Sequence, residues 1–274
     1  MSDILAASAA IAGVPGWDPR ELDIRVLHGG MTNRTFLVRR GNDRYVLRIA
    51  PEPPPAYLPD RRSSLATQRA AAAAGLAPDI IHADPAQGVL LCRYAPGPVW
   101  SAADLQINDN VESLAALLRR VHALPPARER YDAPAAASAY AKALRGHEDL
   151  GRIAWHCEQL VRDSTSADEP CTCHNDIVAQ NVVATPQLVL LDWEYAGLND
   201  PLFDLASPIC YHDLPERPAL ALLSAYAGGA GGELRDRLGA QLRRFDAIQW
   251  LWLAHRDAET HADRLALLRE RLAL

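Results

Sequence analysis

Residues 173–181 read Cys-His-Asn-Asp-Ile-Val-Ala-Gln-Asn, and Asp192 follows at the end of the apolar run 188–191. The β-branched run after Asn181, a Pro-Gln turn and the apolar run together predict a β-hairpin. Asn181 would open one strand and Asp192 would close the other, so both side chains are expected at the same end of the hairpin. Asp176 lies on the loop that leads into it.

These three side chains fit phosphoryl transfer. That reaction needs an acceptor held in line, a carboxylate at its hydroxyl and cations across the phosphates. Magnesium prefers oxygen ligands and takes only one or two from the protein when phosphate and water supply the rest. The alternative is turn chemistry alone, because Asp and Asn side chains often bond their own backbone.

Composition sets outer limits on the function. The chain has 274 residues, 49% of them hydrophobic, which is enough for one large or two modest lobes. With 34 acidic against 28 basic residues and a formal charge of −6, an electrostatic grip on nucleic acid is not expected.

Nothing in the sequence suggests a membrane anchor or a secretion signal. The apolar stretch 4–14 follows Asp3 rather than a basic residue, and Pro15-Gly16 ends it early, so a short helix is predicted there. No apolar run approaches the roughly 20 residues that span a bilayer. We therefore expect a cytoplasmic protein with no membrane partner; the sequence does not indicate its oligomeric state.

The five cysteines are odd in number and scattered, which argues against a disulfide framework. Cys171-Thr172-Cys173-His174 resembles part of a zinc site. Zinc sites usually combine two pairs of ligands, and the sequence offers no second pair beside this one. We did not expect zinc here.

The first 95 residues read as a small sheet lobe. Strands are predicted at 23–27, 35–38, 45–49, 80–82 and 89–92, with an alanine-rich helix over 63–74 that Gly75 ends. Glycine-rich and Asn-Asp turns join the first three strands, which predicts an antiparallel meander.

From residue 96 to 274 the pattern becomes helical. Leu114, Leu117, Leu118 and Val121 follow the spacing of a helix with one buried stripe. Further helices are predicted over 135–146, 148–162, 218–226 and 233–256, the last of them apolar on nearly every side. The fold class is α+β, with a small antiparallel sheet lobe and a larger, mostly helical one.

This order of motifs resembles the choline/ethanolamine kinase branch of the aminoglycoside phosphotransferase superfamily, which has the bilobal protein-kinase-like fold. The resemblance covers about residues 27–252. The motifs that carry it are Gly29-Gly30-Met31-Thr32-Asn33, Tyr45-Val46-Leu47-Arg48-Ile49, Gly75-Leu76-Ala77-Pro78, Cys173-His174-Asn175-Asp176 with Asn181, Leu191-Asp192-Trp193-Glu194-Tyr195-Ala196-Gly197 and Phe203-Asp204-Leu205-Ala206.

The resemblance implies ATP and Mg²⁺ as cofactors and gives each motif a role. Asp176 resembles the catalytic base, Asn181 and Asp192 the magnesium ligands, and Asp204 the aspartate that braces the catalytic loop. The implied nucleotide site comprises the phosphate-covering turn, the strand cation and the backbone that pairs with adenine, namely Gly30, Met31, Thr32, Asn33, Arg48, Arg93 and Ala95.

One family feature is missing. The family usually carries a glutamate on the first-lobe helix that holds the strand cation, and the equivalent position falls near Ser64, where residues 63–68 contain no acid. Either Gln68 or a serine hydroxyl replaces it, or Arg48 is held by the nucleotide alone. The gap leaves open a pseudokinase that binds nucleotide without turnover.

The expected substrate is a small cationic alcohol. Quaternary ammonium groups bind on aromatic faces, each worth roughly 0.5 to 2 kcal/mol, and acids such as Glu194, Asp200 and Asp213 would add attraction. The candidate substrate residues are Glu194, Tyr195, Tyr211, Trp250 and Trp252. Two positions apart on a helix, Trp250 and Trp252 point in nearly opposite directions, so at most one can line the cleft. The alternative is that both belong to the core.

The function predicted from sequence is therefore an ATP-dependent kinase of choline, ethanolamine or a related cationic alcohol. Thiamine kinase and aminoglycoside phosphotransferase are alternatives with the same chemistry. A nucleotide-binding pseudokinase is the alternative of another class, and a purely structural helical protein would require all six motifs to be coincidental.

Overall fold

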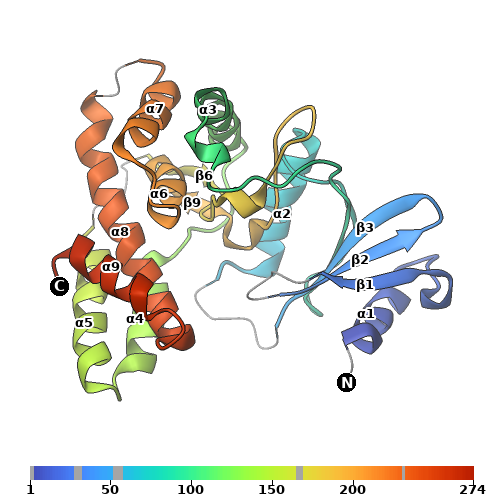
Figure 1. Cartoon of the computed structure of the whole chain (residues 1–274). Helices are drawn as coiled ribbons and strands as arrows, with labels where there is room; N and C mark the ends of the chain where they lie inside the picture. The colour runs from blue at the N-terminus through green and yellow to red at the C-terminus, as the bar shows by residue number, and fades with distance from the viewer. Residues whose placement is uncertain (1–2, 28–32, 52–57, 165–168, 230–231) are drawn as a thin grey trace.

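The computed structural model describes residues 3–27, 33–51, 58–164, 169–229 and 232–274. Figure 1 shows a sheet lobe on one side and a larger helical lobe on the other, with helix α2 between them. The predicted fold class is confirmed.

The small lobe is a five-stranded antiparallel sheet in the order β1-β2-β3-β5-β4. Alternation buries Phe36 and Val38 on β2 and Leu47 on β3, and helix α1 packs with this face to form a separate small core. Strand β3 thereby presents Arg48 on the opposite face from Leu47. The strands are β1 (Asp23–Leu27), β2 (Arg34–Arg40), β3 (Asp43–Ile49), β4 (Ile80–Asp84) and β5 (Val89–Arg93), and α1 spans Asp3–Ala12.

Helix α2 (Arg61–Ala73) lies between strands β3 and β4 of the small lobe in the chain, but it packs against the large lobe. Asp60 caps its start, and Gly75 follows its end with a positive φ of 69°. Ala71, Leu76 and Ala77 join the core of the helical lobe. A division at residue 95, predicted from the sequence, therefore separates the strands from the helices but cuts through this shared packing.

The large lobe is built around the long helix α8, which packs against α4, α5, α6 and α9, while α3 packs against α7. The described helices are α3 (Asn108–His122), α4 (Ala133–Leu144), α5 (Glu148–Asp163), α6 (Pro201–Tyr211), α7 (Glu216–Ala227), α8 (Gly232–Asp257) and α9 (Ala262–Leu272). Sequence patterns did not indicate α6 or α9. Helix α6 contains Pro208, a residue that usually breaks helices, yet Asp200 caps its start and its residues are almost all buried.

Two short strand pairs carry the loop of residues 173–181. Strand β6 (Cys171–Cys173) pairs with β9 (Gly197–Asn199), and β7 (Val182–Val183) pairs with β8 (Val189–Leu190). The predicted hairpin is confirmed, with strands shorter than predicted. Asn181 ends a 3₁₀ turn (Ala179–Asn181) just before β7, and Asp192 follows β8 by two residues.

The connection between the lobes runs against this hairpin. The Trp100 N–H donates to the Val182 carbonyl at 2.9 Å, and the Ala184 N–H donates to the Pro98 carbonyl at 2.9 Å. Gly97 lies so close that a Cβ atom there would clash with the backbone carbonyl of Ala184. Only glycine fits this crossing.

Gly97→Ala is therefore expected to cost about 2 kcal/mol of unfolding free energy and to lower the melting temperature by about 4 to 8 °C. The matched control is Gly146→Ala, because a Cβ at Gly146 meets no atom within 4 Å. Differential scanning calorimetry checks both variants. Equal melting temperatures for the two would show that the Gly97 crossing relaxes freely.

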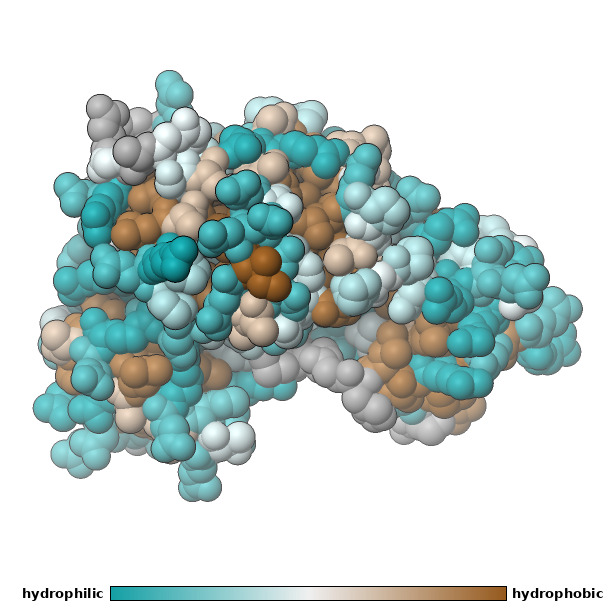
Figure 2. All heavy atoms as spheres, turned by 45° about the horizontal axis from the view of Figure 1, so that its top comes forward, coloured by the Kyte–Doolittle hydropathy of each residue, from teal (hydrophilic) through white to brown (hydrophobic). Residues whose placement is uncertain are grey.

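Polar residues cover much of the face drawn in Figure 2. Among the helices of the described ranges, none is both long and apolar enough to cross a bilayer.

Candidate active site

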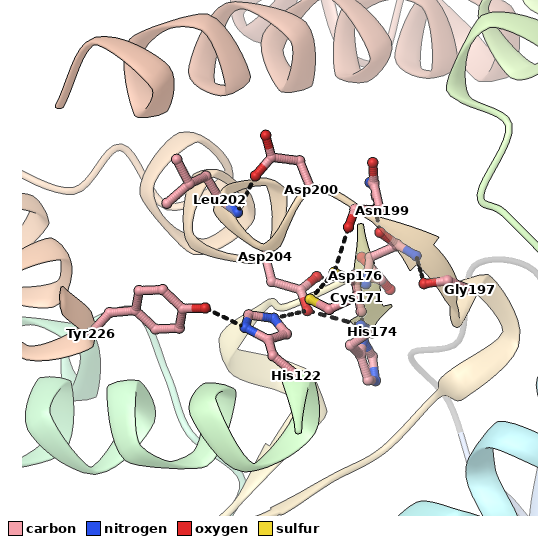
Figure 3. Close-up of polar contacts among 12 residues, drawn as sticks. His122, Cys171, His174, Asp176, Gly197, Asn199, Asp200, Leu202, Asp204 and Tyr226 are labelled. Carbon is pink, nitrogen blue, oxygen red and sulfur yellow. Dashed lines mark hydrogen bonds and ion pairs between the residues drawn. The ribbon is translucent and has the colours of Figure 1, made fainter. Parts of the chain in front are cut away.

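The loop after β6 is held from below by a buried aspartate. Asp204, on α6, is fully buried and accepts hydrogen bonds from the backbone N–H of His174 at 2.8 Å and of Asn175 at 2.7 Å (Figure 3). The Asn175 side chain donates to the Tyr195 carbonyl and accepts from the Asn199 amide. These bonds hold Asn175 at a positive φ of 67°, a conformation that is uncommon outside glycine. The bracing role predicted for Asp204 is confirmed by these contacts.

His174 ties the same loop to the strand that ends near Asp192. Its Nε2–H donates to the Leu191 carbonyl at 2.8 Å, and its Nδ1 accepts from the Asp176 N–H at 3.3 Å. Its ring packs edge-on to Trp193, and burial lowers the pKa of His174, which keeps the ring neutral. Sequence reasoning gave His174 no role, because its partners are backbone atoms distant in sequence.

Asp176, on the loop that leads into the hairpin, lies beside Asn181. The Asn181 side-chain amide donates to a carboxylate oxygen of Asp176 at 3.0 Å and to the Asp176 carbonyl at 3.0 Å. Since the Nδ2 group faces Asp176, Oδ1 is the Asn181 atom that can ligate a cation. Asp192 has a left-handed backbone, with φ of 60°, and begins the 3₁₀ turn Trp193–Tyr195.

Arg48 crosses from the sheet to reach this group. Its guanidinium contacts the Asp192 carboxylate at 2.5 Å and the Glu194 carboxylate at 2.9 Å, and its side chain is 19% exposed. Arg48 is therefore not a solvent-exposed strand arginine. A forked cation between two carboxylates is the geometry in which arginine differs most from lysine.

Glu194 takes the place of the missing helix glutamate. It bonds Arg48 and also accepts from the Asn33 side-chain amide at 2.7 Å. All three sequence-based explanations for that gap were wrong: Gln68 donates to the Cys92 sulfur, Ser64 donates to the Arg61 carbonyl, and Arg48 is held without nucleotide. Glu194, predicted to attract the substrate, instead belongs to the ion pair that holds the strand cation.

Three carboxylates converge here with one arginine between two of them. Burial, and then repulsion from Asp192 and Glu194, raise the pKa of Asp176 to about 8. Burial and the Asp192 charge also raise the pKa of Glu194, against the opposing effect of Arg48. Surplus negative charge among oxygen donors suits a hard divalent cation, so the Asn181 amide oxygen and the Asp192 carboxylate fit magnesium.

The raised pKa of Asp176 predicts a pH effect on stability. In the unfolded chain this carboxyl has a pKa near 3.8, so between that value and about 8 the folded chain binds more protons. Stability from this group is thus present below the unfolded pKa and declines as pH rises toward 8. At pH 8 we expect the free energy of unfolding of metal-free Asp176→Asn to exceed that of wild type by about 1 to 3 kcal/mol, and at pH 4 we expect little difference. The range is reduced because the carboxyl is partly exposed. Urea titrations across pH check it; a constant difference would contradict it.

The structure describes only some of the residues predicted to bind the nucleotide. Gly30, Met31 and Thr32 lie outside the described residues, whereas Asn33 is buried against Glu194. At the connection between the lobes, the Arg93 N–H already donates to the Asp79 carbonyl at 2.8 Å, and Ala95 is partly exposed. Adenine pairing at Arg93 and Ala95 stays a prediction.

A cavity of about 670 Å³ adjoins the site. It lies between α2 and the turn joining β4 to β5, and it reaches Arg48 and Glu194 but neither Asp176 nor Asp192. The cavity therefore lies beside the group formed by Asp176, Asn181 and Asp192 and does not include it.

The aromatic candidates separate into two groups. Burial raises the pKa of both Tyr195 and Tyr211, the Glu194 charge adds to the rise at Tyr195, and the Asp176 charge contributes at both. Trp250, by contrast, is fully buried in the core. The Arg256 guanidinium lies over the Trp252 ring in a cation–π contact. The burial of Trp250 excludes it from a cleft, and a substrate role for Tyr195 and Tyr211 stays a prediction.

Sequence reasoning missed a neighbouring aromatic residue. Tyr131 packs edge-on to Tyr195 with ring centroids 6.1 Å apart, and Tyr140 contributes to the raised pKa of Tyr195. The isolated bridge between Arg130 and Leu198 brings this segment to β9. No pattern around Tyr131 could have signalled that pairing.

The additional acids expected to attract a cation are engaged with arginines. Asp200 pairs with Arg237, and Asp213 pairs with Arg264 and Arg271. They do not provide the unpaired negative charge that the sequence suggested.

Comparison with known proteins agrees with this geometry. Residues 23–240 match the phosphotransferase enzyme family. The chain belongs to this family. The matched stretch includes the whole sheet from β1, the loop of residues 173–181, Asp192 and Asp204.

Relatives and solved structures narrow the resemblance. The chain is 29% identical over 212 residues to the protein LicA of Haemophilus influenzae, covering 72% of this chain and 61% of that protein, so it spans less than two thirds of that relative. A choline/ethanolamine kinase family protein of Mesorhizobium loti is 26% identical with a TM-score of 0.75, covering 99% and 97% of the two chains. The choline kinase LicA of Streptococcus pneumoniae, 20% identical over 98% of each chain with a TM-score of 0.78, shares the fold.

Proposed function

We propose that this protein is an ATP-dependent kinase that phosphorylates the hydroxyl of a small alcohol. Two observations carry the proposal. The partly buried Asp176 carboxylate accepts a hydrogen bond from Asn181, and Arg48 forms ion pairs with Asp192 and Glu194. A base, an oxygen ligand pair and a fixed guanidinium are the parts that phosphoryl transfer requires.

Each residue has a distinct task in the proposed reaction. Asp176 accepts the proton of the acceptor hydroxyl as its oxygen attacks the terminal phosphorus. In its ionised form, the raised pKa makes Asp176 a stronger proton acceptor than an ordinary aspartate. Arg48, positioned by Glu194, contacts phosphate oxygens with a charge that burial does not remove.

Magnesium would be held by Asn181 and Asp192. Held by these two oxygen ligands, the ion would supply positive charge to offset the charge of the phosphates. The same positive charge would relieve the repulsion between Asp192 and Asp176.

For the acceptor we propose choline, ethanolamine or a related cationic alcohol. The relatives named above support this class. For the nucleotide, a solved complex of LicA with AMP, 19% identical to this chain, supports an adenine nucleotide. Tyr195 and Tyr211 near Asp176 offer aromatic faces for a cationic headgroup, with Tyr131 packed behind Tyr195. Thiamine and aminoglycosides are the competing acceptors.

The test is ADP release from Mg-ATP with choline, ethanolamine, thiamine and an aminoglycoside, each at equal concentration. We expect choline or ethanolamine to give a kcat/KM at least tenfold above the other two. Turnover with thiamine or the aminoglycoside alone would overturn the acceptor class but not the kinase. No turnover with any acceptor, together with a thermal shift on adding ATP, would favour the pseudokinase, whose sequence argument is weakened because Glu194 supplies the missing acid.

A further inference from the structure

Two cysteines and a histidine face one another beside the catalytic loop. Cys171 and Cys173 are two positions apart on β6, so their side chains lie on the same face, and their sulfur atoms are 3.8 Å apart. A ring nitrogen of His122, from the last turn of α3, lies within 4.8 Å of both sulfurs. The sequence showed only the Cys-Thr-Cys half of this group; α3 supplies the third ligand.

We propose that Cys171, Cys173 and His122 form a binding site for a thiophilic metal ion of the zinc class. Two thiolates on a tetrahedral ion, each with a metal–sulfur distance of about 2.3 Å, lie about 3.8 Å apart. The sulfurs are already at that separation. A movement of roughly 1 Å by the His122 side chain would bring its nitrogen to the ligand distance of about 2.0 Å.

A disulfide between the same cysteines fits less well. Residues two apart on an extended strand have Cα atoms about 6.6 to 6.8 Å apart, at the upper limit for a disulfide, and the sulfurs would have to approach to about 2.0 Å. An ion spans the gap without distorting β6, which is paired with β9 along its whole length.

One side of the site is open to solvent, which allows ion entry. Cys171 is partly exposed, whereas Cys173 is buried and donates weakly to the Asn199 carbonyl at 3.6 Å. The contact with the Cys173 sulfur, with a contribution from His122, lowers the pKa of Cys171, whereas burial raises the pKa of Cys173 well above its usual value, so ion binding would have to displace the Cys173 proton. Binding would release the thiol protons, and the exposed side would leave a fourth position for water.

The site touches the support of the catalytic loop. His122 Nδ1 contacts the Tyr226 hydroxyl at 2.7 Å, and Nε2 contacts the Asp204 carboxylate at 3.1 Å (Figure 3). Figure 3 draws the Cys171 sulfur beside Asp204, on the side of the His122 ring away from Tyr226. An ion bound by Nε2 would therefore compete with Asp204 for His122. It would be separate from magnesium, which prefers the oxygen donors of Asn181 and Asp192.

Cobalt(II) titration of the metal-free, reduced full-length chain tests the proposal, with excess magnesium present. We expect a thiolate-to-cobalt absorption band that saturates at one equivalent and is displaced by zinc. Cys171→Ser and Cys173→Ser should each abolish it, and His122→Gln should weaken cobalt binding at least tenfold. Cys157→Ser, which removes a buried cysteine of α5, is the matched control and should keep the band.

Absence of the band in the wild-type chain, or its persistence in both serine variants, would overturn the proposal. So would loss of two titratable thiols in the metal-free chain without added ion, because that result indicates a disulfide. If a serine variant fails to fold, a zinc-induced rise in the wild-type melting temperature that dialysis against a chelator reverses still supports the site, and no rise overturns it. None of these measurements depends on turnover, so they are independent of the proposed kinase activity.

Discussion

Asp176→Asn is expected to lower kcat for ADP release at least about 10³-fold while changing the affinity for ATP by less than about threefold. The loss follows from the task of the carboxylate, since general-base catalysis typically contributes 10²- to 10⁴-fold. The variant keeps an acceptor oxygen for the Asn181 amide, so the loop geometry should survive. Steady-state kinetics and nucleotide titration calorimetry measure the two quantities.

The control for that change is Asp163→Asn, on the exposed end of α5. It removes the same charge far from the loop and should leave kcat within about twofold. Turnover by Asp176→Asn above about a tenth of wild type would show that another group accepts the proton. Weakened ATP binding together with a lower melting temperature would show that Asp176 acts mainly on structure.

Most of the sheet could be predicted because its pattern is local. The expected strand 23–27 is the observed β1, and the strands expected at 35–38 and 45–49 lie within β2 and β3. Alternating burial and strong turn residues carry that information within a few positions. Helix α6 escaped prediction because Pro208 argues against a helix locally, while its burial against α8 favours one.

The site could be predicted only where one motif held it. Asp176 and Asn181 are five residues apart and bond directly, so their pairing could be expected from the sequence. The partner of Arg48 is Glu194, 146 residues away, and no local signal points to it. Likewise His122 meets Asp204 and the two cysteines only because α3 packs beside β6.

Aromatic residues illustrate the same limit. A tryptophan-rich helix predicts burial in general, but which ring faces a cleft depends on the neighbours of α8 in space. Trp250 is enclosed by the core, whereas Tyr195 and Tyr211, from other segments, have pKa values that burial and the Asp176 charge raise.

Glu194→Gln is expected to raise the magnesium concentration for half-maximal turnover about tenfold and to lower kcat/KM by about 10²-fold. In the wild-type chain Glu194 shares the Arg48 charge with Asp192. Without the Glu194 carboxylate, Arg48 would pair with Asp192 alone. Magnesium would then have to compete with the Arg48 guanidinium for the Asp192 carboxylate. Loss of one negative charge near the metal acts in the same direction.

The matched control is Glu158→Gln, because Glu158 is also buried and also paired with an arginine, Arg162, but lies on α5. It should leave the magnesium dependence unchanged. A second variant, Arg48→Lys, completes a double-mutant cycle in which the two losses should be clearly less than additive, since both break one ion pair. Additive losses, or an unchanged magnesium requirement in Glu194→Gln, would mean that Glu194 does not position Arg48 during turnover, and the missing helix glutamate would again have no replacement.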